Sequence, residues 1–219
     1  GFRKEVRYDA ATRRVTGLLP DGTEATEFHD QWGRPVRRVD QEARVTTFEY
    51  VADTGWLAAV TLPPPSAGAT APTWRFTYDE AGLRTSQIDP LGRTTRFAYD
   101  EVGRLRRQTL PAGESRFMAY DAVGRLTQLV DYDGQPTTFE YDQADRLRRR
   151  RHADGTDVRF TYTAGGRRAT EEDARGVTSY QYDAAGRLAR VDQPGTGAVQ
   201  YAHDISNRLT SIATPGGTT

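Results

Sequence analysis

The stretch FAYDEVGRL at residues 97–105 returns as MAYDAVGRL at residues 118–126 and as YQYDAAGRL at residues 180–188. Aligned on the tyrosine before the aspartate, ten register positions follow one another at a spacing of about 21 residues. These register positions are Tyr8, His29, Tyr50, Tyr78, Tyr99, Tyr120, Tyr141, Tyr162, Tyr182 and His203. Self-similarity at a fixed period is the signature of a repeat architecture, so the sequence predicts a single repeat array over residues 1–219.

The residues before each register position predict a β-strand. An aromatic residue recurs two positions earlier, and the residue between the two is small or polar, as at Thr77 and Ala98. The recurring aromatic residues are Phe48, Phe76, Phe97, Phe139, Phe160, Tyr180 and Tyr201. Period-two alternation places both rings on one face of a strand. We expect the rings of successive units to stack in ladders along a sheet.

The Asp-x-x-Gly sequence after the register position is typical of a tight turn. Aspartate favours the first position of a type I turn, and a left-handed fourth residue produces the G1 bulge of a hairpin. Two units replace the glycine by Asp145 and Asn207, which are residue types that tolerate positive φ. A second turn is marked by Asp21-Gly22, Gly92, Gly113, Asp133-Gly134, Asp154-Gly155 and Gly176.

Each unit is therefore expected to consist of two short strands and two tight turns. The predicted fold class is all-β, an antiparallel β-hairpin repeat array of ten units that forms a curved or spiralling sheet. The structural signature of the array consists of Tyr78, Asp79, Gly82, Tyr99, Asp100, Gly103, Arg104, Tyr120, Asp121, Gly124, Arg125, Tyr141, Asp142, Tyr182, Asp183, Gly186 and Arg187. Stacked copies of the arginine after the turn are expected to lie near turn aspartates of neighbouring units.

Composition predicts a thin but ordered protein. Only 36% of the residues are hydrophobic, yet the chain contains 11 Tyr, 8 Phe and 3 Trp. Thirty basic residues balance thirty acidic ones, so net charge gives no attraction to nucleic acid or to an anionic membrane. The absence of cysteine excludes disulfides and thiolate metal sites. No apolar segment is long enough to span a membrane as a helix.

Candidate catalytic groups are few. His29 and His203 occupy register positions and are interpreted as flat-ring replacements for tyrosine, and His152 has no second histidine at metal-ligand spacing. The run RLRRRR at Arg146–Arg151 could bind phosphate or an acidic surface, but alternation in a strand would divide its side chains between two faces. We therefore predict no enzyme activity, no cofactor, no metal and no nucleic-acid partner.

The units YDEVGRL, YDAVGRL and YDAAGRL closely resemble the Rhs, or YD-repeat, family, and the resemblance extends from residue 6 to about residue 212. It implies a spiralling antiparallel sheet that winds into a hollow shell in full-length relatives, which include bacterial Rhs toxins, cocoon components of insecticidal Tc toxins, and teneurins. For bacterial members the resemblance implies a shell that encloses a variable C-terminal toxin until delivery. The resemblance also implies secretion or delivery at the cell surface.

Two segments depart from the pattern or need separate interpretation. The third unit reads YVADTGWLAAV, with Gly55 one place late and Trp56 in the leucine position, and it carries a proline-rich insertion at residues 62–72. Three consecutive prolines cannot join a central ladder, so we predict a surface loop. The sequence DPLGR at Asp89–Arg93 is only superficially similar to the self-cleavage segment of the relatives, and we interpret it as an ordinary repeat turn.

The width of the predicted array decides between a complete shell and a part of one. About twenty strands at ~4.8 Å make a sheet roughly 95 Å wide, whose closed ring is too narrow for a toxin domain. We therefore expect one stretch of shell wall, with the remaining repeats and an enclosed cargo as partners and with edges open to self-association. The alternative is a carbohydrate-binding adhesion module that uses Trp32, Trp56 or Trp74. A hydrolase would need a deep pocket with convergent polar groups.

Overall fold

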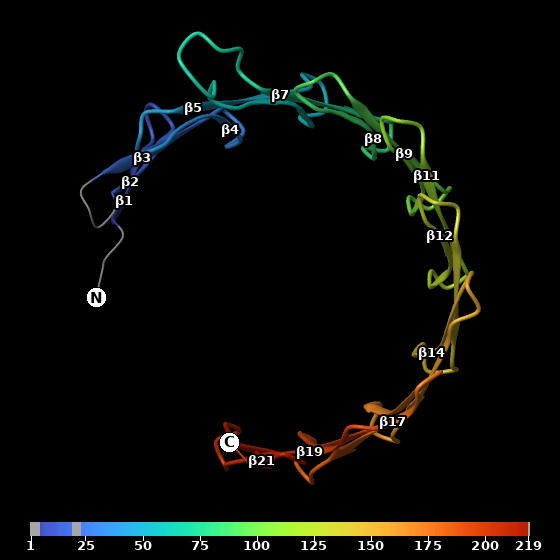
Figure 1. The fold of residues 1–219 in the computed structure, drawn as a ribbon. Helices are drawn as coiled ribbons and strands as arrows, with labels where there is room; N and C mark the ends of the chain where they lie inside the picture. Colours follow the sequence, from blue (N-terminus) through green and yellow to red (C-terminus); the bar gives the residue numbers. More distant parts are fainter. Residues whose placement is uncertain (1–4, 19–22, 219) are drawn as a thin grey trace. The chain divides into compact units, whose positions relative to one another are not determined.

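The computed structural model describes residues 5–18 and 23–218, and all regular secondary structure in these ranges is β-strand (Figure 1). The predicted turn at Asp21-Gly22 lies outside the described residues. Within them no helix is long and apolar enough to cross a membrane. The chain divides into two compact units, Gly1–Glu114 and Ser115–Thr219, although the 21-residue spacing continues from Tyr99 to Tyr120 across this division.

Among the described residues, the first unit contains ten strands. They are β1 Glu5–Asp9, β2 Arg14–Leu18, β3 Glu24–His29, β4 Pro35–Val39, β5 Val45–Tyr50, β6 Leu57–Thr61, β7 Thr73–Tyr78, β8 Arg84–Ile88, β9 Thr94–Tyr99 and β10 Leu105–Thr109. Each strand pairs in antiparallel fashion with the next strand in the sequence. The unit is therefore a continuous meander of hairpins.

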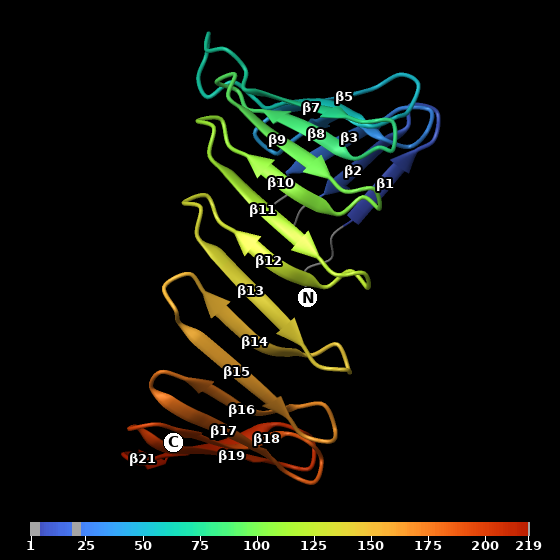
Figure 2. The ribbon, with the colours of Figure 1, turned by 90° about the vertical axis from the view of Figure 1, so that its right-hand side faces the viewer.

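The second unit repeats this arrangement. Its strands are β11 Ser115–Tyr120, β12 Leu126–Val130, β13 Pro136–Tyr141, β14 Leu147–His152, β15 Asp157–Tyr162, β16 Arg168–Asp173, β17 Gly176–Tyr182, β18 Leu188–Gln193, β19 Gly197–His203, β20 Leu209–Thr214 and β21 Gly217–Thr218. Sequential antiparallel pairing again joins neighbours. Figure 2 shows β11 to β15 side by side, with their turns along two margins. The predicted fold class is confirmed.

The turns have the predicted geometry. In the turn after β9, the Gly103 N–H donates to Asp100 O at 3.0 Å, and the Asp100 N–H donates to Arg104 O at 2.9 Å. Gly103 has a φ of 83°, and the non-glycine replacements Asp145 and Asn207 have φ values of 60° and 65°. The register then shifts by one residue beside Tyr99, which is the expected β-bulge.

The second set of turns and the two unusual segments are also confirmed as turns and loops. Gly92 and Gly134 have φ values of 80° and 77°. In DPLGR, Asp89 binds the N–H groups of Leu91 and Arg93 as other repeat turns do. The proline-rich insertion leaves the sheet between β6 and β7 as a loop, closed by a 2.8 Å hydrogen bond from the Leu62 N–H to Pro72 O (Figure 1).

One assignment made from the sequence is wrong, in the third repeat, whose register position is Tyr50. The Val51 N–H donates to Trp56 O, and Leu57 is the residue that lies opposite Tyr50. Because this turn is one residue longer, Trp56 takes the position of the post-turn arginine, and Leu57 takes the leucine position.

Each unit is a single layer of strands with two different faces. The aromatic face carries the register residues and the aromatic residues two places earlier, such as Phe97 and Tyr99, while the polar face carries the residues between them, such as Arg96 and Ala98. Among the described residues no side chain is completely buried, and Phe160 is among the few large ones below 9% exposure. Stability must therefore come from contacts between neighbouring strands rather than from a thick core.

Candidate functional site: the link between successive repeats

Each turn aspartate holds its own turn together. In the turn Asp142–Arg146, Oδ1 accepts hydrogen bonds from the N–H groups of Ala144 at 2.9 Å and Arg146 at 3.0 Å. Oδ2 accepts a third from the Arg146 side-chain Nε at 2.7 Å. The same three contacts recur in the turns that begin at Asp30, Asp40, Asp89, Asp100, Asp121 and Asp204.

Two signature turns differ in detail. Asp183 binds the backbone N–H and side-chain Nε of Arg187. Asp79 binds the N–H groups of Ala81 and Leu83 and has no arginine in the fifth position. The Nε of the arginine thus binds the aspartate four residues earlier in its own turn, a contact that adds to the expected proximity to the turn of the neighbouring repeat.

The remaining guanidinium nitrogens reach the next repeat. Arg125 Nη1 lies 2.5 Å from Asp145 Oδ1, and Arg187 Nη1 donates to Asp204 O at 2.7 Å. Asp145 replaces a turn glycine, so its carboxylate occupies the place where the guanidinium of the preceding repeat arrives. This contact explains why an acidic residue suits that turn.

The same guanidinium groups lie over the register tyrosines of the next repeat. The Arg125 guanidinium carbon is 5.0 Å from the Tyr141 ring centroid, and the corresponding distances are 4.6 Å for Arg146 and Tyr162 and 4.4 Å for Arg34 and Tyr50. These are cation–π contacts. The expected ring-on-ring ladder is corrected to an alternating one, because consecutive register tyrosines are two strands, or about 9.6 Å, apart. Trp56 replaces the arginine at one link, with its ring 5.3 Å from that of Tyr78.

The tyrosine hydroxyl completes the link and was not foreseen from the sequence. Tyr141 donates to Leu126 O at 2.9 Å, and the register of β12 with β13 begins two residues further on, at Gln128 opposite Thr138. The same contact is made by Tyr50, Tyr78, Tyr99, Tyr162 and Tyr182. The tyrosine hydroxyl thus donates a hydrogen bond to a carbonyl that lies beyond the last backbone pair of the two strands. The signal was present, because the register position holds Tyr or His while Phe is common two places earlier.

Changing Tyr141 to phenylalanine is expected to lower the free energy of unfolding by about 1 kcal/mol, because Leu126 O loses its donor while the ring contact with Arg125 remains. Urea denaturation followed by circular dichroism measures this effect. The control is Phe139→Tyr, which adds a hydroxyl at the neighbouring aromatic position. An unchanged midpoint for Tyr141→Phe would show that the hydroxyl does not stabilise the link.

The contacts within the turns and between repeats also shift the pKa values of the turn aspartates and of the register tyrosine Tyr141. The hydrogen bond from the Arg146 side chain, followed by that from its backbone N–H, holds the pKa of Asp142 below the ordinary value of 3.8, against an opposing effect of desolvation. Lowered pKa values also characterise Asp30, Asp40, Asp89, Asp100, Asp121, Asp183 and Asp204. Desolvation raises the pKa of Tyr141, which keeps its hydroxyl a donor.

These lowered pKa values predict acid-sensitive stability. An aspartate whose pKa is lower in the folded protein stabilises it fully above the unfolded value of 3.8, and this contribution is lost as pH falls through the folded value. The free energy of unfolding should therefore change little between pH 7 and about pH 5 and fall steadily below about pH 4. Urea titrations across this range test it, with Asp142→Asn expected to show a shallower fall. A flat profile to pH 2.5 would contradict the assignment.

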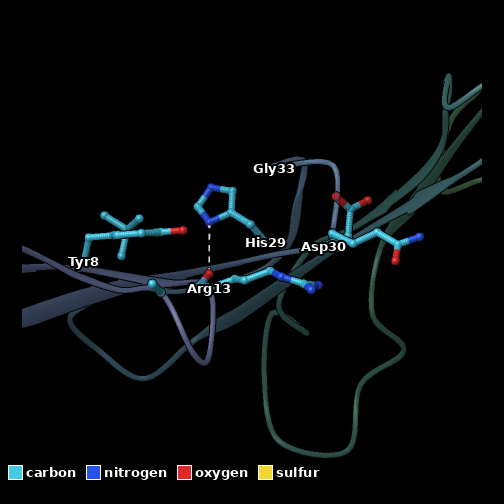
Figure 3. Close-up of a pocket in the computed structure, with 8 residues that line it drawn as sticks. Tyr8, Arg13, His29, Asp30 and Gly33 are labelled. Atoms are coloured by element: carbon cyan, nitrogen blue, oxygen red, sulfur yellow. Dashed lines mark hydrogen bonds between the residues drawn. The ribbon is translucent and has the colours of Figure 1, made fainter.

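The two register histidines lie where tyrosines are otherwise found. His29 Nδ1 lies 3.3 Å from Arg13 O (Figure 3). The His29 Nε2 lies 2.9 Å from Glu27 Oε1. Tyr8 and His29 line an open hollow of about 450 Å³. Asp30 also lines it, but its carboxylate binds its own turn. His203 ends β19 at the corresponding position.

The other candidate residues do not form one surface. Trp32 is 67% exposed in a turn with the Arg34 guanidinium over its ring, Trp56 packs on Tyr78, and Trp74 is half-buried on β7. His152 Nδ1 contacts the Thr137 hydroxyl. Within the two described ranges no three His, Cys, Asp or Glu residues are grouped as for a metal ion.

The arginine run on β14 is divided between the two faces. Arg149, which lies opposite Glu140, binds Asp157 at 2.8 Å and Glu140 at 3.4 Å. Arg150 lies opposite Phe139 on the aromatic face. The run therefore does not present one continuous basic patch, as the alternation predicts.

These features define a β-hairpin repeat protein. Its most regularly repeated set of side-chain contacts joins one repeat to the next and has a structural role. The family model described as RHS Repeat matches residues 78–115, 120–157 and 182–219, which together make up more than half of the chain. The chain belongs to this Rhs, or YD-repeat, family. No curated protein matches it by sequence.

Solved structures share the fold. The chain is similar to the crystal structure of TcdB2-TccC3-TEV, with a TM-score of 0.81 and 19% identity over 97% of this chain and 12% of that chain. It is also similar to TcdB2-TccC3-Cdc42, with a TM-score of 0.80, 18% identity, and 96% and 12% coverage. For the Photorhabdus luminescens Tc holotoxin pore with the mutation TccC3-D651A, the values are 0.76, 17%, 100% and 14%. The chain therefore spans only about an eighth of the length of these chains.

Proposed function

We propose that this chain is a non-catalytic segment of the wall of an Rhs/YD-repeat shell, which encloses a C-terminal toxin or another cargo polypeptide. The observation that carries the proposal is the recurring link, in which an arginine ties several of the repeats to the next one, as between Arg125 and Tyr141. Such a single-layered sheet forms a barrier by extension, because each added repeat lengthens the wall without needing a second layer.

The comparisons support the proposal through the fold. The chain corresponds to about an eighth of much longer chains in Tc toxin structures, as expected for one stretch of a larger wall. The proposed partners are the remaining repeats of the same shell and the enclosed polypeptide, and the proposed location is outside the producing cell or at its surface.

Protease protection of the complete gene product that contains this array tests the proposal. An enclosed polypeptide should survive proteinase K while the shell is intact and should be digested once mild denaturant opens it. The matched control is the same polypeptide expressed without the repeats, which should be digested at once. Equal digestion rates with and without the intact repeats would refute the enclosing role.

One observation favours a carbohydrate-binding alternative. The exposed Trp32 lies beside a hollow of about 340 Å³ that is also lined by Arg34, Asp53 and Thr54. An exposed indole with nearby polar groups suits a sugar ring. Saturable binding on a glycan array that is lost in Trp32→Ala and retained in Trp74→Ala would support this function, and binding to no glycan would dismiss it.

A further inference from the structure

Four consecutive strands of the first unit carry arginines and no carboxylates. β7, β8, β9 and β10 contain Arg75, Arg84, Arg96, Arg106 and Arg107 and neither Asp nor Glu. Arg84 is used on the aromatic face, where its guanidinium carbon lies 4.8 Å from the Phe97 ring centroid. Arg75 and Arg96 lie on the polar face, because they are adjacent in sequence to Phe76 and Phe97.

Arg75 and Arg96 differ from Arg159 and Arg190, two polar-face arginines of the second unit. Arg159 lies 3.1 Å from Asp157, and Arg190 lies 2.6 Å from Asp192. In the part of the chain that the structure describes, no carboxylate lies within 4.0 Å of Arg75 or Arg96, and both side chains are exposed. The charges of these two arginines are therefore available to a partner.

Hydroxyl groups occupy the surface between them. The Thr77 hydroxyl oxygen lies 2.8 Å from that of Thr85 and 2.7 Å from that of Ser86. Ser86 lies opposite both Thr77 on β7 and Arg96 on β9, so the hydroxyl cluster is next to one arginine and within two residues of the other. Arginine guanidinium groups that lie beside hydroxyl donors are suited to bind carboxylates.

We propose that the polar face of β7–β10 docks an acidic polypeptide segment, whose carboxylates pair with Arg75 and Arg96. An acidic peptide is favoured over nucleic acid because the rings of Phe76, Tyr78 and Phe97 lie on the opposite face and cannot stack with bases. The net charge of zero also gives no long-range attraction to a phosphate backbone. The docking surface does not depend on the chain forming part of a shell.

Fluorescence anisotropy with the whole chain tests the surface. The probe is a fluorescein-labelled twelve-residue peptide of alternating Glu and Ser, measured at low and at physiological salt. The double variant Arg75→Gln with Arg96→Gln should weaken binding at least about tenfold, because two charge-assisted contacts are lost. The control, Arg159→Gln with Arg190→Gln, removes the same charge from the corresponding face of the second unit and should change binding less than about twofold.

Three results would overturn the proposal: no binding of the peptide to the unmodified chain, an equal loss in both double variants, or a tenfold preference for a twelve-residue oligothymidylate that depends on Arg75 and Arg96. Thermal unfolding checks that each variant folds. If the Arg75/Arg96 variant fails to fold, modification of the unmodified chain by phenylglyoxal replaces it. The peptide should then protect Arg75 and Arg96 and leave Arg159 reactive, and uniform reactivity would count against the surface.

Discussion

Gly82→Ala is expected to lower the free energy of unfolding by about 3 to 4 kcal/mol, through two additive causes. Gly82 has a φ of 82°, where an alanine costs about 1 to 2 kcal/mol. A Cβ there would also lie 2.8 Å from Cζ2 of Trp56. The indole cannot withdraw without losing its contact with Tyr78.

The matched control is Gly92→Ala. Gly92 has nearly the same φ, 80°, but a Cβ would meet nothing within 4 Å. The free energy of unfolding of the Gly92→Ala variant should therefore fall only by the backbone strain of about 1 to 2 kcal/mol. Urea denaturation followed by tryptophan fluorescence measures both variants. Equal losses in the two variants would mean that the packing of Trp56 against the turn at Gly82 contributes nothing to the free energy of unfolding.

Phe160→Ala should produce the second large loss, about 3 kcal/mol. Phe160 is 6% exposed on β15, and the Arg168 guanidinium carbon lies 4.5 Å from its ring centroid. Removing the ring exposes Val158, which is 5% exposed on the same face. The same denaturation experiment measures the effect.

Phe117→Ala is the control for the chemical change. Phe117 is 44% exposed on the polar face of β11, so its truncation should cost about 1 kcal/mol or less. Phe160→Leu should give an intermediate loss, because most of the apolar volume is kept. A loss at Phe117 as large as that at Phe160 would contradict the assignment of the stabilising contacts to the aromatic face.

The turns and strands were predictable because their signals are local. Asp100 and Gly103 lie within one turn, and even the substitutions Asp145 and Asn207 kept the required backbone conformation. The links between repeats were less predictable, because they join residues that are brought together only by the pairing of strands. The placement of a guanidinium over Tyr141 and the hydroxyl contact with Leu126 O depend on a register set 15 or more residues away.

The position of Trp56 shows the same limit. Counting from Tyr50 assigned it to the leucine position, whereas the longer turn moves it by one place and makes it the substitute for an arginine. A spacing count cannot detect such a shift, since it is the hydrogen bonds of the turn that decide which residue resumes the strand.

The antiparallel pairing of each repeat with the next is tested most directly by cysteine cross-linking, which is clean because the chain contains no cysteine. Thr170 on β16 lies directly opposite Ser179 on β17, and directly opposite residues of an antiparallel pair have the nearest Cβ atoms, at about 4.5 to 5.5 Å. Thr170→Cys with Ser179→Cys is expected to oxidise to an intramolecular disulfide, while Thr170→Cys with Gln181→Cys is expected to stay reduced. Efficient cross-linking of the second pair and not the first would contradict this pairing of the strands.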